Sequence, residues 1–402
     1  MEKLFTLLEE EKKRQNEQLN LIASENFASK NVRMFAGSIL TNKYAEGYPK
    51  RRYYGGCEKV DEIESLVIEK ACELFGVKFA NVQPHSGSQA NMICYMALMN
   101  EHDKLLSLSL DQGGHLSHGS PVNFSSKLYE VHHYHLGKDG RLDYELIHQM
   151  AKELKPKIIL AGFSSYPFII DFKKLHDIAK EVGAYLMADI AHIAGLIAGK
   201  AIPNPLPYVD VATSTTHKTL RGPRGGLILT NDEEIIKKIN KSCFPGVQGG
   251  PLEHIIAAKA MCFMEDLSPD YQKYAHDILV NTKTCNDEFA LLGDVVSGTE
   301  THLFLLNTKK SFGMSGKEAE DKLAKIGITV NKNMLPFDEE KPAITSGLRI
   351  GFAALTSRGL KPNDAKFIAH IIHDYLKGDL DSYRASGLVK SITSRLIKVE
   401  NI

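Results

Sequence analysis

The stretch Thr213 to Gly226, "TSTTHKTLRGPRGG", follows a strand-like run, "YVDVA" (208–212). Hydroxyl and imidazole side chains precede a single lysine, Lys218, and a segment dense in Gly, Arg and Pro follows it. A lysine at the end of a strand is usually solvated, because a flexible ammonium group costs little to keep in water. Lys218 is therefore informative only if the rest of the sequence predicts other reactive side chains beside it.

The length and charge of the chain indicate a two-domain protein that acts on small molecules. Its 402 residues exceed the size at which a single core stops growing, roughly 250 to 300 residues. Lys+Arg and Asp+Glu each number 49, so the formal net charge is zero. Such a chain has no overall basic field that would attract nucleic acid or an anionic membrane, and we expect neither as a partner.

Cysteine usage and the N-terminal segment bear on the compartment. The cysteines form no Cys-x-x-Cys pair, which argues against a zinc site and a disulfide framework; they are Cys57, Cys72, Cys94, Cys243, Cys262 and Cys285. The segment "MEKLFTLLEEEKKRQNEQLN" (1–20) contains acids throughout, unlike a secretory signal, and is predicted to be a helical arm. No window approaches 18 uncharged apolar residues. We expect a soluble cytoplasmic protein without a bound metal.

Helical and strand-like segments alternate from about residue 58 onward. In "EKVDEIESLVIEKACELFG" (58–76), apolar residues recur at helical spacing, and Gly76 suits a left-handed cap. Further helices are predicted at 143–154 and 172–183. The predicted strands cover 78–83, 104–110, 127–134, 157–163, 184–190, 209–213 and 225–230. This pattern is typical of an α/β fold with a largely parallel sheet and helices on both faces.

A second, smaller domain is expected after the Pro/Gly-rich "CFPGVQGGP" (243–251) and a helical stretch to about residue 265. The remaining segments are predicted to be a strand at 301–308, a helix at 316–327, strands at 328–334 and 347–355, and a helix at 363–378. The expected division is a helical arm at 1–35, a large cofactor-binding domain at 36–265 and an α+β domain at 266–402.

Chemically useful side chains follow several of the predicted strands, where open α/β sheets bind ligands. Gly87 and Ser88 precede a helix predicted to begin near Gln89, which would make a phosphate cradle, although an ordinary serine N-cap is the competing explanation. His115 follows the strand at 104–110, where a surface histidine would look similar. Asp189 lies in an apolar strand, and a structural pairing with arginine would also explain it.

A phosphate cradle, a buried acid, a ring-stacking histidine and a strand-end lysine are together what a pyridoxal phosphate site requires. Lys218 would form an internal aldimine, and Asp189 would keep the pyridine nitrogen protonated so that the ring can accept electrons. At about 4 Å and an effective dielectric constant near 20, a carboxylate–pyridinium pair is worth roughly 4 kcal/mol before desolvation. The residues therefore predict an enzyme that uses pyridoxal 5'-phosphate.

The motifs also resemble those of the serine hydroxymethyltransferase family over nearly the whole chain. They are "LIASEN" (21–26), "TNKYAEGYP" (41–49), "RRYYGGCE" (51–58), "VQPHSGSQAN" (82–91), "GGHLSHGSPVNFS" (113–125), "TTHKTLRGPRGG" (215–226), "FPGVQGGP" (244–251), "VNKN" (330–333) and "TSGLRIG" (345–351). The resemblance implies the aspartate aminotransferase-like fold and a homodimer with shared active sites. It implies reversible conversion of L-serine and tetrahydrofolate to glycine and 5,10-methylenetetrahydrofolate.

The resemblance also assigns expected roles to individual residues. Lys218 is the aldimine lysine, Asp189 the partner of the pyridine nitrogen and His115 the stacking ring. The other cofactor-binding residues that it implies are Gly87, Ser88, Ser164, His192 and His217, joined by Tyr44 and Gly250 of the other subunit. Arg349 and Ser24 are the implied binders of the substrate carboxylate, the arginine through its bidentate fork. Tyr54 and Glu46 are implied to reach the substrate from the other subunit, and the implied folate-lining residues are Leu110, Gly114, Leu116 and Asn333.

Two segments depart from the family pattern. Phe352, Ala353 and Ala354 stand where Thr-Pro-Ala is usual, beside Arg349, and "NEHD" (100–103) replaces an expected Pro-Gly-Asp turn. Neither removes an implied catalytic side chain. Two other functions remain open from the sequence: a folate-independent threonine or β-hydroxy amino acid aldolase, and a catalytically silent homologue that acts as a binding protein, on RNA for example.

Overall fold

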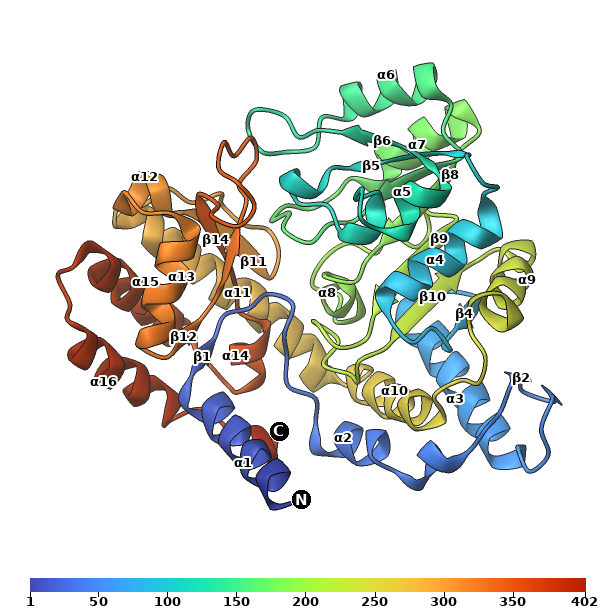
Figure 1. The fold of residues 1–402 in the computed structure, drawn as a ribbon, viewed down its shortest axis with the longest axis horizontal. Helices are drawn as coiled ribbons and strands as arrows, with labels where there is room; N and C mark the ends of the chain where they lie inside the picture. Colours follow the sequence, from blue (N-terminus) through green and yellow to red (C-terminus); the bar gives the residue numbers. More distant parts are fainter. The chain divides into compact units, whose positions relative to one another are not determined.

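The computed structural model describes residues 1–402, which divide into two compact units. The larger unit comprises residues 31–164 and 170–272, and the smaller unit comprises residues 1–30, 165–169 and 273–402. The first thirty residues thus belong to the same unit as the C-terminal part of the chain (Figure 1). No helix combines the length and the apolar character that crossing a bilayer would require.

The larger unit is built on a seven-stranded sheet with the order β4-β10-β9-β8-β7-β5-β6. The strands are β4 (Phe79–Asn81), β5 (Lys104–Leu108), β6 (Glu130–Tyr134), β7 (Ile158–Ala161), β8 (Tyr185–Asp189), β9 (Val211–Thr215) and β10 (Gly226–Thr230). The pairs among β9, β8, β7, β5 and β6 are parallel, whereas β10 runs antiparallel to both β9 and β4. All seven predicted strands are present, and the prediction of an α/β fold with a largely parallel sheet is confirmed.

Both faces of the central strands are buried, which explains why their sequences read as continuous apolar runs. Ile158 and Leu160 of β7 pack in one cluster with helix residues such as Ile93 and Ile236, while the alternate residue Ile159 is equally inaccessible. The helices of this unit are α3 (Glu58–Phe75), α4 (Gly87–Leu98), α5 (Phe124–Leu128), α6 (Tyr144–Leu154), α7 (Phe172–Val182), α8 (Ala194–Ala198), α9 (Glu233–Lys241) and α10 (Glu253–Asp266). Gly76 ends α3 at a φ of 68°, as its sequence predicted.

Short elements complete the larger unit. They are most of α2 (Lys30–Ala36), the helical turns η1 (Ile39–Asn42), η2 (Leu110–Gln112), η3 (Leu116–His118) and η4 (Ser242–Val247), and the two-stranded hairpin β2 (Gly47–Tyr48) and β3 (Arg51–Arg52). Helix α11 (Pro269–Leu291) begins in the larger unit and continues into the sequence of the smaller one. The turns η2 and η3 follow β5, so the loop that they form begins at a carboxyl end of the parallel strands.

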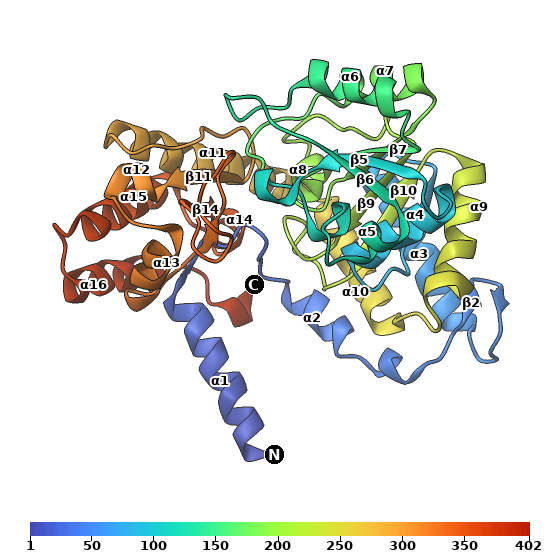
Figure 2. The same ribbon diagram turned by 45° about the horizontal axis from the view of Figure 1, so that its top comes forward.

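The smaller unit contains a three-stranded antiparallel sheet with the order β11-β14-β13. Its elements are α1 (Glu2–Glu17), β1 (Leu19–Asn20), β11 (Leu303–Asn307), α12 (Thr308–Phe312), α13 (Gly316–Lys325), β12 (Ile328–Thr329), β13 (Asn331–Asn333), β14 (Gly347–Gly351), α14 (Ala353–Ser357), α15 (Pro362–Lys377), α16 (Ser382–Thr393) and η5 (Val399–Asn401). Strand β1 pairs in parallel with β12, and α1 projects from the rest of its own unit (Figure 2).

The prediction of a single strand at 347–355 is wrong in its second half. Strand β14 ends at Gly351, and residues Ala353–Ser357 form α14. Phe352 sits at the turn between them with a φ of −113° and a ψ of 2°, and its side chain is buried in the core of the smaller unit. The predicted strand at 328–334 is likewise divided into β12 and β13. The run after Gly351 is short and apolar, and such a run fits a buried helix as well as a strand, which is why the prediction failed there.

Candidate active site

The start of α4 forms a compact cradle after β4. Helix α4 begins at Gly87, two residues before the predicted start, and Ser86 caps it by accepting a hydrogen bond from the Gln89 amide at 3.2 Å. A Cβ atom on Gly87 would lie 2.7 Å from Cγ2 of Thr215, so only glycine lets this turn approach β9 so closely. The amides of a first helical turn have no partner within their helix and favour anions. Ser88 is exposed in this turn and Ser86, rather than Ser88, is the N-cap.

Asp189 ends β8 and is held as an anion by a network of donors. Its Oδ2 atom lies 2.9 Å from Nε2 of His118 and 2.9 Å from Nδ2 of Asn91, and its Oδ1 atom accepts from the Ala191 amide. Burial by itself would raise the pKa of Asp189, but the hydrogen bond and charge of His118 hold it well below its usual value. These partners include no arginine, so the competing explanation of an Asp–Arg pair does not apply.

The same network reaches His115. Asn91 donates from Nδ2 to Oγ of Ser117 at 2.8 Å, and the Ser117 amide donates to Nδ1 of His115 at 3.2 Å. Burial lowers the pKa of His115 to about 4, so its ring is neutral near pH 7 and can lie against a flat ligand. His118 and Asn91 were not among the site residues predicted from the sequence. Two features of the sequence could have indicated them: His118 is a second histidine three residues after His115, and Asn91 is a polar residue one turn into the helix that follows the cradle.

Lys218 lies in a tight loop between β9 and β10. The Arg221 amide donates to the Lys218 carbonyl. The loop is closed by two further bonds, from the Thr216 amide to the Gly225 carbonyl and from the Gly222 amide to the Thr216 carbonyl. Lys218 is partly buried, unlike the solvated lysine of the ordinary explanation. Burial lowers the pKa of the neighbouring His217 to about 3, and its Nδ1 atom is buried without a hydrogen-bond partner. A buried ring nitrogen left unpaired is expected where a ligand supplies the partner.

The expected folate-lining residues of the larger unit gather in the loop after β5. Leu110 in η2 and Leu116 in η3 are both 47% exposed although they are large and apolar. A Cβ atom on Gly114 would lie 2.3 Å from the Leu108 carbonyl oxygen, so this turn also requires glycine. The amide of Ser164 donates to the carbonyl of Gly113 at 2.8 Å, which joins the end of β7 to this loop. His192 is buried just beyond Asp189, and its carbonyl accepts from the Thr219 hydroxyl in the Lys218 loop.

Four residues expected to act in the other subunit form one surface cluster. The rings of Tyr44 and Tyr54 lie 4.8 Å apart between centroids, and the Tyr44 hydroxyl is 3.4 Å from Oε1 of Glu46. Gly250 lies against the Tyr44 ring, where a Cβ atom would come within 3.1 Å of it. Tyr44 is 52% exposed and Tyr54 is 46% exposed. These aromatic side chains are therefore open to a partner.

The smaller unit holds the expected carboxylate-binding pair. Arg349 on β14 directs Nη2 to Oδ1 of Asn331 at 3.2 Å and to Oγ of Ser24 at 3.5 Å. Burial lowers the pKa of Arg349 to about 10, which leaves the guanidinium charged at neutral pH. Asn333 lies on β13 opposite Gly347 of the same strand β14. Asn331, which the sequence analysis did not identify, orients the guanidinium from the paired strand.

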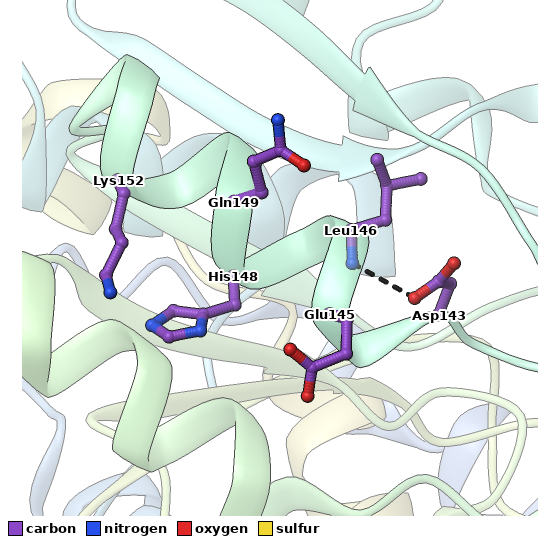
Figure 3. A pocket seen from close by; sticks show the side chains of 6 residues that line it. All are labelled: Asp143, Glu145, Leu146, His148, Gln149 and Lys152. Atoms are coloured by element: carbon purple, nitrogen blue, oxygen red, sulfur yellow. Dashed lines mark hydrogen bonds between the residues drawn. The ribbon is translucent and has the colours of Figure 1, made fainter.

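A shallow surface hollow on α6 contains none of these residues. Figure 3 shows Asp143 capping the helix through the Leu146 amide, and His148 and Lys152 both bind Glu181 of α7. The residues that line the hollow are Asp143, Glu145, Leu146, His148, Gln149 and Lys152. They lie on and just before α6, and none of them is a hydrogen-bond partner of Asp189, whose partners are His118, Asn91 and Ala191. The candidate site is therefore built from the strand ends and not from this hollow.

Comparisons with known proteins agree with the motifs. The family model described as serine hydroxymethyltransferase matches residues 1–372. A protein of a Nitratiruptor species named serine hydroxymethyltransferase is 53% identical over 376 residues, which are 93% of this chain and 90% of that protein. One of the same name from Crocosphaera subtropica is 53% identical over 93% of this chain and 88% of its own. The chain belongs to the serine hydroxymethyltransferase family.

Proposed function

We propose that the chain catalyses the reversible transfer of the hydroxymethyl carbon of L-serine to tetrahydrofolate, giving glycine and 5,10-methylenetetrahydrofolate. Its membership of the family makes it a pyridoxal phosphate-dependent enzyme. The observation that carries the proposal is the anionic Asp189, which His118 and Asn91 hold at the end of β8. Strand β8 pairs with β9, and the loop after β9 contains Lys218.

The residues of the larger unit fit the cofactor. Three observations support this fit: the close approach at Gly87, the unpaired Nδ1 atom of His217 and the low pKa of Asp189. We infer that the first turn of α4 binds the phosphate, that Asp189 holds a proton at the pyridine nitrogen and that the Lys218 amine carries the cofactor covalently. When bound, pyridoxal phosphate supplies a ring that accepts the electron pair released at the substrate α-carbon.

The neutral ring of His115 suits stacking on the cofactor, because an imidazolium would oppose the positive charge that Asp189 maintains at the pyridine nitrogen. His192 and Ser164 are proposed to face the phenolic oxygen of the cofactor. Arg349 is proposed to bind the substrate carboxylate through the fork of its guanidinium group, with Ser24 beside it. The exposed apolar surfaces of Leu110 and Leu116, with Gly114 between them and Asn333 of the smaller unit, are proposed to receive the folate.

We propose further that the enzyme is a homodimer whose active sites are shared. Residues 34–54 expose large apolar side chains that a single chain leaves uncovered: Met34, Ile39, Tyr44, Tyr53 and Tyr54. Exposed apolar residues that gather in one segment, with the Tyr44 and Tyr54 rings in contact, support a protein interface there. In this arrangement Tyr44 and Gly250 bind the cofactor phosphate in the active site of the partner subunit, and Glu46 and Tyr54 contact the substrate there.

Two measurements test the proposal. Borohydride reduction of the purified protein with pyridoxal phosphate, followed by peptide mapping, should find the adduct on Lys218. Formation of glycine from L-serine should require tetrahydrofolate. Cleavage that proceeds equally well without tetrahydrofolate would favour an aldolase, and the absence of any visible absorbance band with the cofactor would favour a silent homologue.

A further inference from the structure

Helix α10 carries a lysine that is buried completely in the larger unit. Nζ of Lys259 lies 2.6 Å from the carbonyl oxygen of Val82, 3.2 Å from that of Pro84 and 2.8 Å from that of Gly226. The side chain is 1% exposed and has no carboxylate partner. A lysine in this condition is rare, because a buried ammonium needs full compensation from hydrogen bonds.

The three carbonyl groups determine the charge of Lys259. An ammonium group has three N–H donors, whereas a neutral amine has two and a lone pair that would face the third carbonyl oxygen. Desolvation lowers the pKa of Lys259 to about 7, so near neutral pH the charge depends on these acceptors. The geometry, with all three oxygens within 3.2 Å, is that of the protonated form.

Lys259 touches both segments that the cofactor has to bridge. Val82 and Pro84 lead directly into the cradle at the start of α4, and Gly226 begins β10 just after the Lys218 loop. The stem of Lys259 also packs beneath that loop, because a Cβ atom on Gly225 would lie 2.5 Å from Cε of the lysine. A single side chain thus connects the phosphate cradle to the loop of Lys218.

Other hydrogen bonds also hold the backbone of the cradle. The Gly226 amide donates to the Pro84 carbonyl at 2.9 Å, next to the bond from Lys259. Gln248 donates to the Gln83 carbonyl and accepts from the His85 amide, at 3.0 and 3.1 Å. The backbone before α4 is therefore held on two sides, by Gln248 and by Lys259.

We propose that Lys259 is a positioning residue that fixes the distance between the phosphate cradle and the Lys218 loop before the cofactor binds. This inference rests on the proposed function, since it assigns the cradle to the cofactor phosphate. Lys259 itself does not touch the cofactor in this role. It arranges the two segments so that phosphate and aldehyde can be bound together without further ordering of the chain.

The test is a graded series at residue 259 with a matched control. Lys259→Met keeps the length of the stem and removes all three donors, and Lys259→Gln retains an amide with two. Phe263→Leu, one turn further along α10 and also buried, disturbs the same helix but removes no hydrogen-bond donor from the cradle. For each protein the dissociation constant of pyridoxal phosphate is measured by equilibrium dialysis, and hydrogen exchange of the cofactor-free form is measured in residues 82–90 and 216–226.

We expect the dissociation constant to rise at least tenfold in Lys259→Met and by an intermediate factor in Lys259→Gln, with faster exchange in both segments. Phe263→Leu should stay within about twofold of the wild type even where its melting temperature falls as much as that of Lys259→Met. Equal affinities across the series, or equal losses in Lys259→Met and Phe263→Leu, would overturn the positioning role. If Lys259→Met does not fold, Lys259→Gln decides the question. A wild-type protein that binds no pyridoxal phosphate would instead refute the proposed function.

Discussion

Glu253, the first residue of α10, should make the larger unit less stable as the pH rises. Its side chain is 0% exposed, and neither carboxylate oxygen has a hydrogen-bond partner. The nearest cation is Nη1 of Arg52 at 3.9 Å, but that guanidinium already binds Asp61 at 2.8 Å and Glu64 at 2.6 Å. Burial, together with the charge of Glu64, raises the pKa of Glu253 to about 8.

The direction and size of the effect follow from this shift. Between its ordinary pKa of 4.5 and about 8, the folded protein keeps a proton on Glu253 that the unfolded chain has lost. The free energy of unfolding therefore falls as the pH rises through this range, and this group contributes no slope outside it. At about 1.4 kcal/mol per pH unit, the full range corresponds to at most about 5 kcal/mol. Relaxation around the carboxylate reduces this, and we expect about 2 kcal/mol.

Glu253→Gln removes the ionisation and keeps the shape of the side chain. Its melting temperature relative to the wild type should therefore rise between pH 5 and pH 8 and then stay constant. In a unit of this size, each kcal/mol of stability shifts the melting temperature by about 2 to 4 °C, so about 2 kcal/mol predicts a gain of about 4 to 8 °C over the wild type. Glu62→Gln, which changes an exposed acid on α3, is the control and should show no such trend. A difference between wild type and Glu253→Gln that is the same at pH 5 and pH 8 would refute the reasoning.

The remaining predictions concern the reaction. Asp189→Asn should keep much of the cofactor affinity and lower kcat at least about 100-fold, since a carboxylate–pyridinium pair at about 4 Å is worth roughly 4 kcal/mol. Wild-type turnover in this variant would contradict the role of Asp189 in holding the proton at the pyridine nitrogen. Mixing inactive Lys218→Arg and Tyr54→Phe proteins should restore activity if sites are shared, and no recovery after proven subunit exchange would contradict the shared site. Glu46→Gln should lose folate-dependent serine cleavage but retain folate-independent cleavage of allo-threonine, and equal losses in the two assays would indicate a general structural role.

The fold of the larger unit was accessible from the sequence because its strands are buried on both faces. Runs such as "KIILAGF" (157–163) have no polar face, so they stand out between amphipathic helices. The same signal failed after Gly351, where "FAAL" (352–355) is apolar but Phe352 forms a turn and the following residues belong to α14. Burial in the core of the smaller unit, and not local preference, selects the conformation there.

The candidate site was only partly visible in the sequence, for a related reason. Asp189 and Lys218 follow strands, so the rule that ligands bind beyond strand ends identifies them. The partners of Asp189 come from a helix and from a loop turn, and their meeting depends on tertiary packing. Asn331 is similar, because it reaches Arg349 only through the pairing of β13 with β14. The first residue of such a network is therefore easier to predict from the sequence than its hydrogen-bond partners.

Two of the charged residues of α10, Glu253 and Lys259, illustrate the same limit and provide a test of it. In "PLEHIIAAKAMCF" (251–263), Glu253 and Lys259 resemble each other as isolated charges in an apolar helix, and the sequence alone would place both in solvent. The structure buries both, but three carbonyl oxygens compensate Lys259 whereas Glu253 has no hydrogen bond. Removing a compensated charge leaves its partners unsatisfied, while removing an uncompensated one relieves a cost. Neutralising Lys259 should therefore destabilise the larger unit and neutralising Glu253 should stabilise it above pH 7, although the residues lie less than two helical turns apart.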